Sequence, residues 1–202
     1  MAIRLENQKD YLEAETLVRE AFWNVDQPGC DEHLVVHKLR DDPSFIKDLT
    51  YVMKEGGIIV AAIYYAIGAL IDEKGNHTKG LLCGPIAVHP KWQQQGVGHI
   101  LIEFTMQKAA ELEYPYILIT SNPLYYARFG FTFAFKNEIH LEGIDNAAEA
   151  PFFMMKILDE SKKIPAEVFH HPSCYSVFQE DVEQFDKMFP YQEKRVLSGQ
   201  LR

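Results

Sequence analysis

Apolar residues recur every three or four positions in several stretches of the chain, which is the spacing of one buried helix face. The first stretch runs from Tyr11 to Phe22 and follows Asn7, a residue type that caps helix N-termini. A second stretch, residues 31–40, ends before the Asp42-Pro43 pair, and a proline there favours a helix end. The same spacing predicts later helices that start at Val97, near residue 123 and at Gln179.

Continuous apolar runs predict the strands. The longest run, Ile58 to Ile71, is rich in Ile, Val and Tyr, is interrupted by Gly68, and is too short for a comfortable membrane span. A buried strand is therefore the better interpretation. A run over residues 81–88 contains Gly84-Pro85, which favours a bulge or an edge because proline lacks a donor N–H. Other predicted strands cover residues 3–6, 51–54, 116–120, 131–135, 152–158 and 168–171.

The order of these elements predicts the fold class. The middle of the chain reads strand, loop, helix, strand, helix, strand, and the front half supplies helices and strands joined by hairpins. This order predicts an α/β (α+β) fold with a mixed, mostly antiparallel central sheet flanked by helices. One parallel crossover is expected over residues 81–120.

Composition and charge exclude several classes of protein. The chain has 202 residues, of which 47% are hydrophobic and 24% charged, which excludes a disordered, collagen-like or coiled-coil protein. The net charge of −9 argues against a general nucleic-acid-binding protein. Three cysteines form no disulfide framework, and the N-terminus has no signal-peptide pattern. We therefore expect a cytoplasmic protein with no membrane association.

Residues 86–99, IAVHPKWQQQGVGH, carry the strongest chemical signal. Two glycines at the start of a helix let backbone N–H groups approach an anion closely. A nucleotide P-loop would need Lys and then Ser or Thr after the second glycine, but His99 and Ile100 stand there. A dinucleotide fingerprint would need a small residue where Leu101 stands. A glycine-rich connector without function and a coenzyme A pyrophosphate site remain.

The run Gln93-x-x-Gly96-x-Gly98, after an Ala-Val-His-Pro strand end, resembles motif A of the GNAT N-acetyltransferase superfamily. Residues 122–131, NPLYYARFGF, resemble motif B of that family, in which an Asn leads to a Tyr-x-x-x-Gly-Phe ending. The two motifs stand in the family's order with a helix and a strand between them. The resemblance covers residues 81–135 firmly and extends to 1–158. It implies a GNAT acetyltransferase domain over 1–158 and a C-terminal extension, 159–202, packed on the same domain.

The resemblance also implies the activity: an acetyl-CoA-dependent N-acetyltransferase of the small bacterial type, in which a primary amine attacks the thioester directly in a ternary complex. Tyr126 would protonate the leaving thiolate, and the amide of Val88 would polarise the acetyl carbonyl. The residues expected to bind the cosubstrate are Ile86, Val88, Gln93, Gln94, Gln95, Gly96, Val97, Gly98, His99, Asn122, Tyr126 and Arg128.

Other questions stay open in the sequence. The general base is unassigned, because residues 80–88 contain no Asp or Glu. The acceptor, a small-molecule or peptide amine, could meet acids near residues 22–32 or within 137–149. A metal site at Cys30, His33 and His37 lacks an evident fourth ligand, so no metal is expected. The alternative function is a coenzyme-A-binding sensor or interaction module with little catalysis, and a homodimer is left open.

Overall fold

The computed structural model describes residues 1–144, 150–162 and 167–200. Within it the chain forms two compact units. Unit 1 comprises Met1–Tyr64, Pro85–Ile102 and Ser173–Arg202, and unit 2 comprises Tyr65–Gly84 and Glu103–Pro172. Each unit is therefore built from segments that lie far apart in the sequence.

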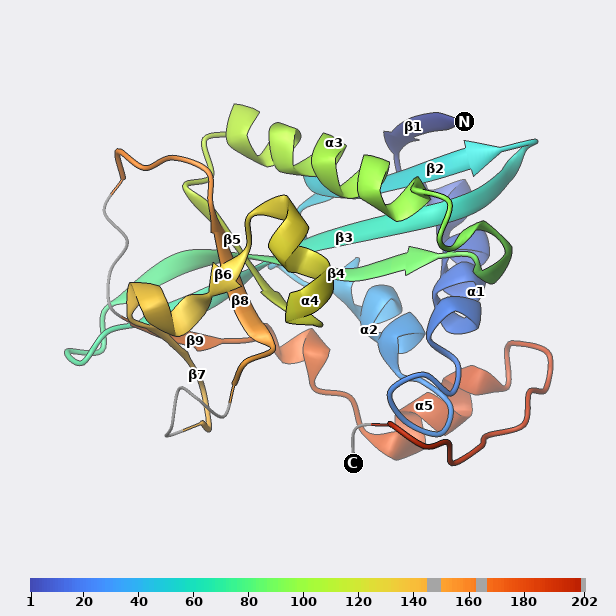
Figure 1. Ribbon diagram of the computed structural model, residues 1–202. Helices are drawn as coiled ribbons and strands as arrows, with labels where there is room; N and C mark the ends of the chain where they lie inside the picture. Colours follow the sequence, from blue (N-terminus) through green and yellow to red (C-terminus); the bar gives the residue numbers. More distant parts are fainter. Residues whose placement is uncertain (145–149, 163–166, 201–202) are drawn as a thin grey trace. The chain divides into compact units, whose positions relative to one another are not determined.

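Unit 1 contains the first strands and the N-terminal helices (Figure 1). Strand β1 (Ala2–Leu5) pairs antiparallel with β2 (Tyr51–Glu55), and β2 pairs antiparallel with the first half of β3 (Ile58–Ile71). Helix α1 (Tyr11–Phe22) packs on α2 (Glu32–Leu39). Asn7 accepts a hydrogen bond from the amide of Lys9 in the turn before α1, which confirms its predicted capping role.

Buried ion pairs join α1 and α2 to the sheet of unit 1. The guanidinium of Arg40, just past α2, contacts the carboxylates of Glu6 and Glu15, and all three side chains are at most 5% exposed. The hydroxyl of Tyr64 donates to Glu6 at 2.7 Å. Because buried charges are costly unless they are paired, this cluster depends on all of its members.

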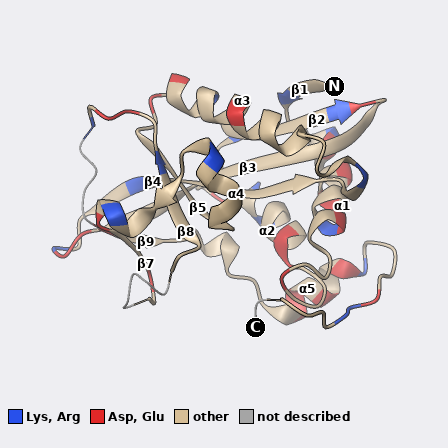
Figure 2. Cartoon of the chain, in the orientation of Figure 1, with Lys and Arg blue, Asp and Glu red and all other residues tan. Residues whose placement is uncertain are grey.

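The C-terminal part of unit 1 covers α2. Helix α5 (Gln179–Asp186) and the residues after it bury Val182, Phe185 and Phe189 against Leu34 of α2. Acidic and basic side chains are interspersed around α5 and along the segment that follows it (Figure 2). The helix predicted to start at Gln179 is confirmed, and it ends at Asp186.

Unit 2 contains the second half of β3, the start of β4 (His77–Val88) and the later strands. Strand β4 pairs in parallel with β5 (Tyr116–Thr120), which confirms the predicted crossover through α3 (Val97–Glu111). Strand β8 (Phe153–Ile157) pairs antiparallel with both β5 and the two-residue β6 (Thr132–Phe133). Strand β9 (Glu167–His170) pairs antiparallel with β3 and in parallel with β7 (Ile139–Leu141).

One prediction for unit 2 needs correction. The strand expected over 131–135 is limited to β6, because the chain turns into a 3₁₀ helix at Ala134–Asn137. The strand predicted over residues 168–171 is confirmed as β9, which is part of the sheet. A side chain at Gly68 would clash with the fully buried ring of Phe169, which explains the glycine inside the longest apolar run. The division of the chain at residue 158 stays a prediction.

The sheet order is β1-β2-β3-β4-β5-β8-β6, with β7 and β9 off this path. This mixed, mostly antiparallel sheet flanked by helices is the fold class that the sequence predicts. None of the helices in the described part of the chain is long and apolar enough to cross a membrane.

Candidate active site

The end of β4 and the loop into α3 form one group of predicted site residues, and all of them lie in unit 1. Ile86 and Val88 are half-buried and alternate with the buried Ala87, as expected at a strand end. The amide of His89 donates to the carbonyl of Val60 at 2.9 Å, which holds the strand end on β3.

Two of the three loop glutamines hold the loop itself. The side-chain amide of Gln93 donates to the carbonyl of Val88 at 3.0 Å, and that of Gln95 donates to the carbonyl of Lys91 at 2.7 Å. Residues 93–96 are all exposed. The glutamine side chains therefore shape the loop, and its backbone is the part presented for binding.

The loop turns into α3 through left-handed backbone conformations. Gln94 has a φ of 60° and Gly96 a φ of 82°. Helix α3 begins at Val97, and the amide of Ile100 donates to the carbonyl of Gly96 at 3.1 Å. The amides of Val97 and Gly98 precede this first intrahelical bond. A first-turn amide group and the positive end of the helix dipole attract anions such as phosphate.

The second group of predicted residues lies in unit 2, around the short helix α4 (Pro123–Tyr126). Asn122 caps this helix, and its side-chain oxygen accepts from the amide of Leu124 at 2.9 Å. The guanidinium of Arg128 lies 4.6 Å from the ring centre of Tyr125 and is exposed. Gly130 of the motif adopts a φ of 80° and ends the following 3₁₀ turn.

Tyr126 is 7% exposed and lies among aromatic rings. The rings of Tyr125 and Phe131 meet it edge to face, with centroids 5.0 and 5.7 Å away. Burial raises the pKa of its phenol well above the ordinary value, and the nearby thiol of Cys83 adds to the rise. The neighbouring hydroxyl of Ser121 lowers the pKa of this phenol and so acts in the opposite direction. The phenol is therefore protonated at neutral pH.

Two neighbours of Tyr126 are absent from the sequence-based prediction. Cys83 is buried on β4, and its thiol adds to the rise that burial causes in the pKa of Tyr65, whose hydroxyl lies 3.0 Å from the hydroxyl of Thr105. Burial raises the pKa of the Cys83 thiol to about 12. Ser121 directly precedes the motif residue Asn122, and this adjacency is a signal that sequence reasoning could have used.

His89 directly follows Val88, whose amide is the proposed oxyanion donor. Both ring nitrogens of His89 lie close to other groups of the protein. Its Nδ1 accepts from the amide of Lys91 at 3.1 Å, and its Nε2 lies 3.4 Å from a carboxylate oxygen of Glu20. An imidazole held in this way has no lone pair left for an incoming amine. The general base stays unassigned.

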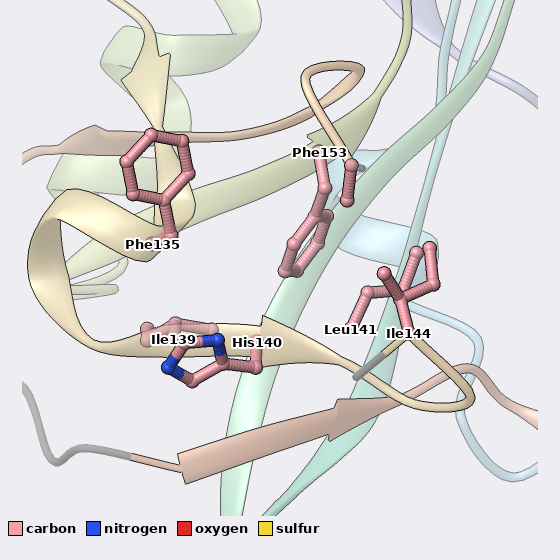
Figure 3. A pocket seen from close by; sticks show the side chains of 7 residues that line it. Phe135, Ile139, His140, Leu141, Ile144 and Phe153 are labelled. Carbon is pink, nitrogen blue, oxygen red and sulfur yellow. The ribbon is translucent and has the colours of Figure 1, made fainter. Parts of the chain in front are cut away.

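The region expected to meet the acceptor is partly described. A hollow that is open to solvent lies within unit 2 (Figure 3). Its empty volume is about 200 Å³ when the adjoining open solvent is counted. It is lined by Phe135, Ile139, His140, Leu141, Ile144, Ala150 and Phe153. The lining is mostly apolar, and Glu142 beside it pairs with His170 at 2.8 Å. Residues 145–149 of the expected region lie outside the described residues.

Two residues of the metal hypothesis, Cys30 and His33, lie together in a buried polar cluster. Nδ1 of His33 lies 3.5 Å from the sulfur of Cys30, and its Nε2 lies 3.1 Å from Asp186 without hydrogen-bond alignment. Burial lowers the pKa of His33 to about 4 and raises that of Cys30. His37 instead faces Glu15 at 2.9 Å. Among the described residues, no three His, Cys, Asp or Glu side chains are grouped to hold a metal.

Comparison with known proteins agrees with this geometry. The family model described as "Acetyltransferase (GNAT) domain" matches residues 47–133. The uncharacterized N-acetyltransferase YhbS of Escherichia coli K12 is 25% identical over 161 residues, which cover 80% of this chain and 90% of that protein.

Two solved structures share the fold. One is YhbS from Escherichia coli in complex with CoA, with a TM-score of 0.73, 20% identity, and coverage of 88% of this chain and 92% of that one. The other is a GNAT family acetyltransferase from Brucella melitensis in complex with acetyl-CoA, with a TM-score of 0.70, 19% identity, and coverage of 87% and 97%. Both motifs lie within residues 47–133, which match the GNAT acetyltransferase domain, and these findings together support a bacterial-type GNAT family member with acyltransferase activity.

Proposed function

We propose that this protein is an N-acetyltransferase that transfers an acetyl group from acetyl-CoA to a primary amine. The observation that carries the proposal is the exposed loop of residues 93–96, which turns through left-handed conformations into the N-terminus of α3. Such a loop presents backbone N–H groups to an anion. Related GNAT proteins crystallised with CoA and acetyl-CoA support this assignment.

The loop would hold the pyrophosphate of the cosubstrate through the amides of residues 94–99. Because backbone amides and a helix end provide this contact, the net charge of −9 does not oppose the binding of a polyanion. Ile86 and Val88 would pair their backbones with the pantetheine arm. In unit 2, Asn122 and Arg128 would contact the cosubstrate near α4.

The reaction would proceed by direct attack in a ternary complex. The amine nitrogen forms a bond with the thioester carbonyl carbon, and the amide of Val88 stabilises the negative oxygen that develops. The carbon–sulfur bond then breaks, and Tyr126 donates its proton to the leaving thiolate. The attacking nitrogen loses a proton to a base that is not assigned.

A thiol-release assay tests the proposal. Acetyl-CoA is incubated with a panel that contains a polyamine, an aminoglycoside, an arylamine and peptides with free N-termini or lysines, and also with water alone. Thiol release that depends on one of the amines is expected. Tight binding of coenzyme A without thiol release from any acceptor would indicate a binding module and contradict the proposed activity.

Tyr126→Phe tests the proton donor. We expect turnover to fall at least about tenfold, because the thiolate then leaves without a proton, while coenzyme A binding measured by calorimetry persists. Tyr125→Phe is the matched control, because it removes a neighbouring phenol that has no assigned role. Unchanged turnover in the Tyr126 variant would exclude this role.

Location and assembly are further parts of the proposal. The three cysteines are unpaired and buried, which supports a reducing compartment such as the cytoplasm. The acceptor is proposed to be a small-molecule or peptide amine, with no nucleic acid involved. A homodimer can be tested by sedimentation of the purified protein.

A further inference from the structure

We infer that the C-terminal segment, residues 190–200, forms one wall of the site that binds the amine acceptor, and that Asn24 is the positioning residue that holds it there. The inference rests on the proposed acetyl transfer and deepens it. It assigns acceptor binding to a part of the chain that lies outside both motifs. Every residue on which the argument depends lies in unit 1.

The first observation is the set of hydrogen bonds around Asn24, in the turn that follows α1. Its side-chain amide donates to the carbonyl of Glu193 at 2.9 Å, and its side-chain oxygen accepts from the amide of Arg195 at 2.9 Å. Its own carbonyl accepts from the side chain of Gln200 at 3.0 Å. The same side-chain oxygen also accepts from the amide of Gly29 at 2.8 Å. One residue therefore joins this turn to three points of the C-terminal segment.

The second observation is that the turn is shaped to receive the segment. Asn24 has a φ of 61°, in the left-handed region that asparagine adopts more readily than most residues, and its amide donates to the carbonyl of Gly29 at 2.8 Å. The indole of Trp23 donates to the carbonyl of Glu193 at 3.1 Å. A carbon added at Gly29 would lie 3.0 Å from Cε of Lys194. The segment therefore packs directly on the turn.

The third observation is that the same end of α1 faces the end of β4. Glu20 lies four residues before Asn24, and its carboxylate is 3.4 Å from Nε2 of His89. His89 is the residue after Val88, the proposed oxyanion donor, and its amide is bound to the carbonyl of Val60 at 2.9 Å. One helical turn advances about 5 Å along the axis. The C-terminal segment is thus held about one turn beyond a side chain that contacts the end of β4.

An amine that attacks an acetyl carbonyl held by Val88 has to approach this end of β4. The carboxylate of Glu20 is 40% exposed, and it attracts an acceptor that arrives as an ammonium ion. Residues 193–199 are exposed, so the segment stays accessible to a ligand while its backbone is held by Asn24. A wall that is already ordered reduces the entropy lost when the acceptor binds.

Asn24→Gly tests the wall. It removes the side chain but suits the left-handed backbone, so it breaks the contacts with the segment without adding strain. Amide hydrogen exchange of residues 193–200 should accelerate. The KM for the best amine of the panel should rise about three- to tenfold, because the acceptor must then order a segment that these hydrogen bonds no longer hold. The KM for acetyl-CoA should stay unchanged.

Two further variants separate this role from a general effect on the fold. Gln200→Ala loosens the same segment by another contact, since it removes the hydrogen bond to the carbonyl of Asn24, and it should also raise the acceptor KM. Asn76→Gly is the matched control, because Asn76 lies in the turn between β3 and β4 in unit 2 and its side chain donates to Asp72 at 2.7 Å. It should leave both KM values unchanged. Melting temperatures of all variants show whether the fold is intact.

The outcomes distinguish this inference from the proposed function. If the unaltered protein releases no thiol with any amine, the proposed function fails and the inference fails with it. If an amine is acetylated but Asn24→Gly and Gln200→Ala keep the acceptor KM of the unaltered protein, the proposed function stands and the wall is overturned. Equal increases in the KM for the acceptor and for acetyl-CoA would also overturn it, since they would indicate a general disturbance of unit 1.

Discussion

Gly96 shows how a single residue determines the shape of the candidate phosphate loop. Its φ of 82° lies in the left-handed region, and a side chain placed there would meet no atom within 4 Å. Glycine is therefore required here because the backbone is left-handed, and not because a side chain would clash with a neighbouring atom. The open space above it is what a bound ligand would need.

Gly96→Ala tests the loop. A left-handed alanine costs ~1–2 kcal/mol, so the free loop should relax and binding must restore the strained conformation. That cost corresponds to an increase of about five- to thirtyfold in the Kd for coenzyme A. Gly57→Ala is the matched control, since Gly57 has a φ of 88°, no atom within 4 Å of its added carbon, and a place in a turn between β2 and β3. Equal affinities of the two variants would contradict the loop assignment.

At the scale of elements, Arg19 of α1 connects the C-terminal segment to the rest of unit 1. Its guanidinium donates to Asp186 at 3.0 Å, to the side chain of Gln192 at 2.8 Å and to the carbonyl of Pro190 at 3.3 Å. It also lies 4.0 Å from the ring centre of Trp23. The side chain is only 5% exposed, so these contacts replace its hydration.

Arg19→Ala should release the C-terminal segment. Because Asp186 loses its guanidinium partner, the free energy of unfolding should fall by roughly 3 kcal/mol. Amide hydrogen exchange of residues 187–195 should accelerate. Arg195→Ala is the control, as its side chain is 64% exposed and pairs with the exposed Glu193. If the two variants exchange at the same rate, Arg19 does not hold the segment.

The elements with local signals could be predicted from sequence. The bounds of β3 and β5 match the apolar runs, since β-branched residues and flanking turns mark both ends. The pairing of β7 with β9 was missed, because contacts between residues 139–141 and 167–169 leave no local pattern. The burial of His33 has no local signal either, because the rings of Phe185 and Phe189 that cover it come from the far end of the chain.

In the candidate site, too, local features could be predicted from sequence and long-range contacts could not. Both motifs are local in sequence, so the loop before α3 and the capped α4 could be predicted with their residues. The partners of those residues could not. The ion pair of Glu20 with His89 and the effect of Cys83 on the pKa of Tyr126 connect separate elements, and only the folded chain shows them.

At the scale of the whole molecule, two buried groups on α2 give opposite pH dependences to stability. Burial lowers the pKa of His33 from 6.5 to about 4, so the unfolded chain takes up a proton first and stability falls as the pH drops through this range. Burial raises the pKa of Glu32 from 4.5 to about 7, so the folded chain takes up a proton first and stability falls as the pH rises through that range.

Between pH 4.5 and 6.5 the two effects oppose each other, so the free energy of unfolding of the unaltered protein should change little. Glu32→Gln removes one of them, and the free energy of unfolding should then rise steadily with pH across this window because the lowered pKa of His33 is no longer opposed. Urea unfolding at several pH values measures this slope. Glu183→Gln, at an exposed position on α5, should behave like the unaltered protein. A Glu32 variant with the same slope as that control would show that its carboxyl does not titrate in this window.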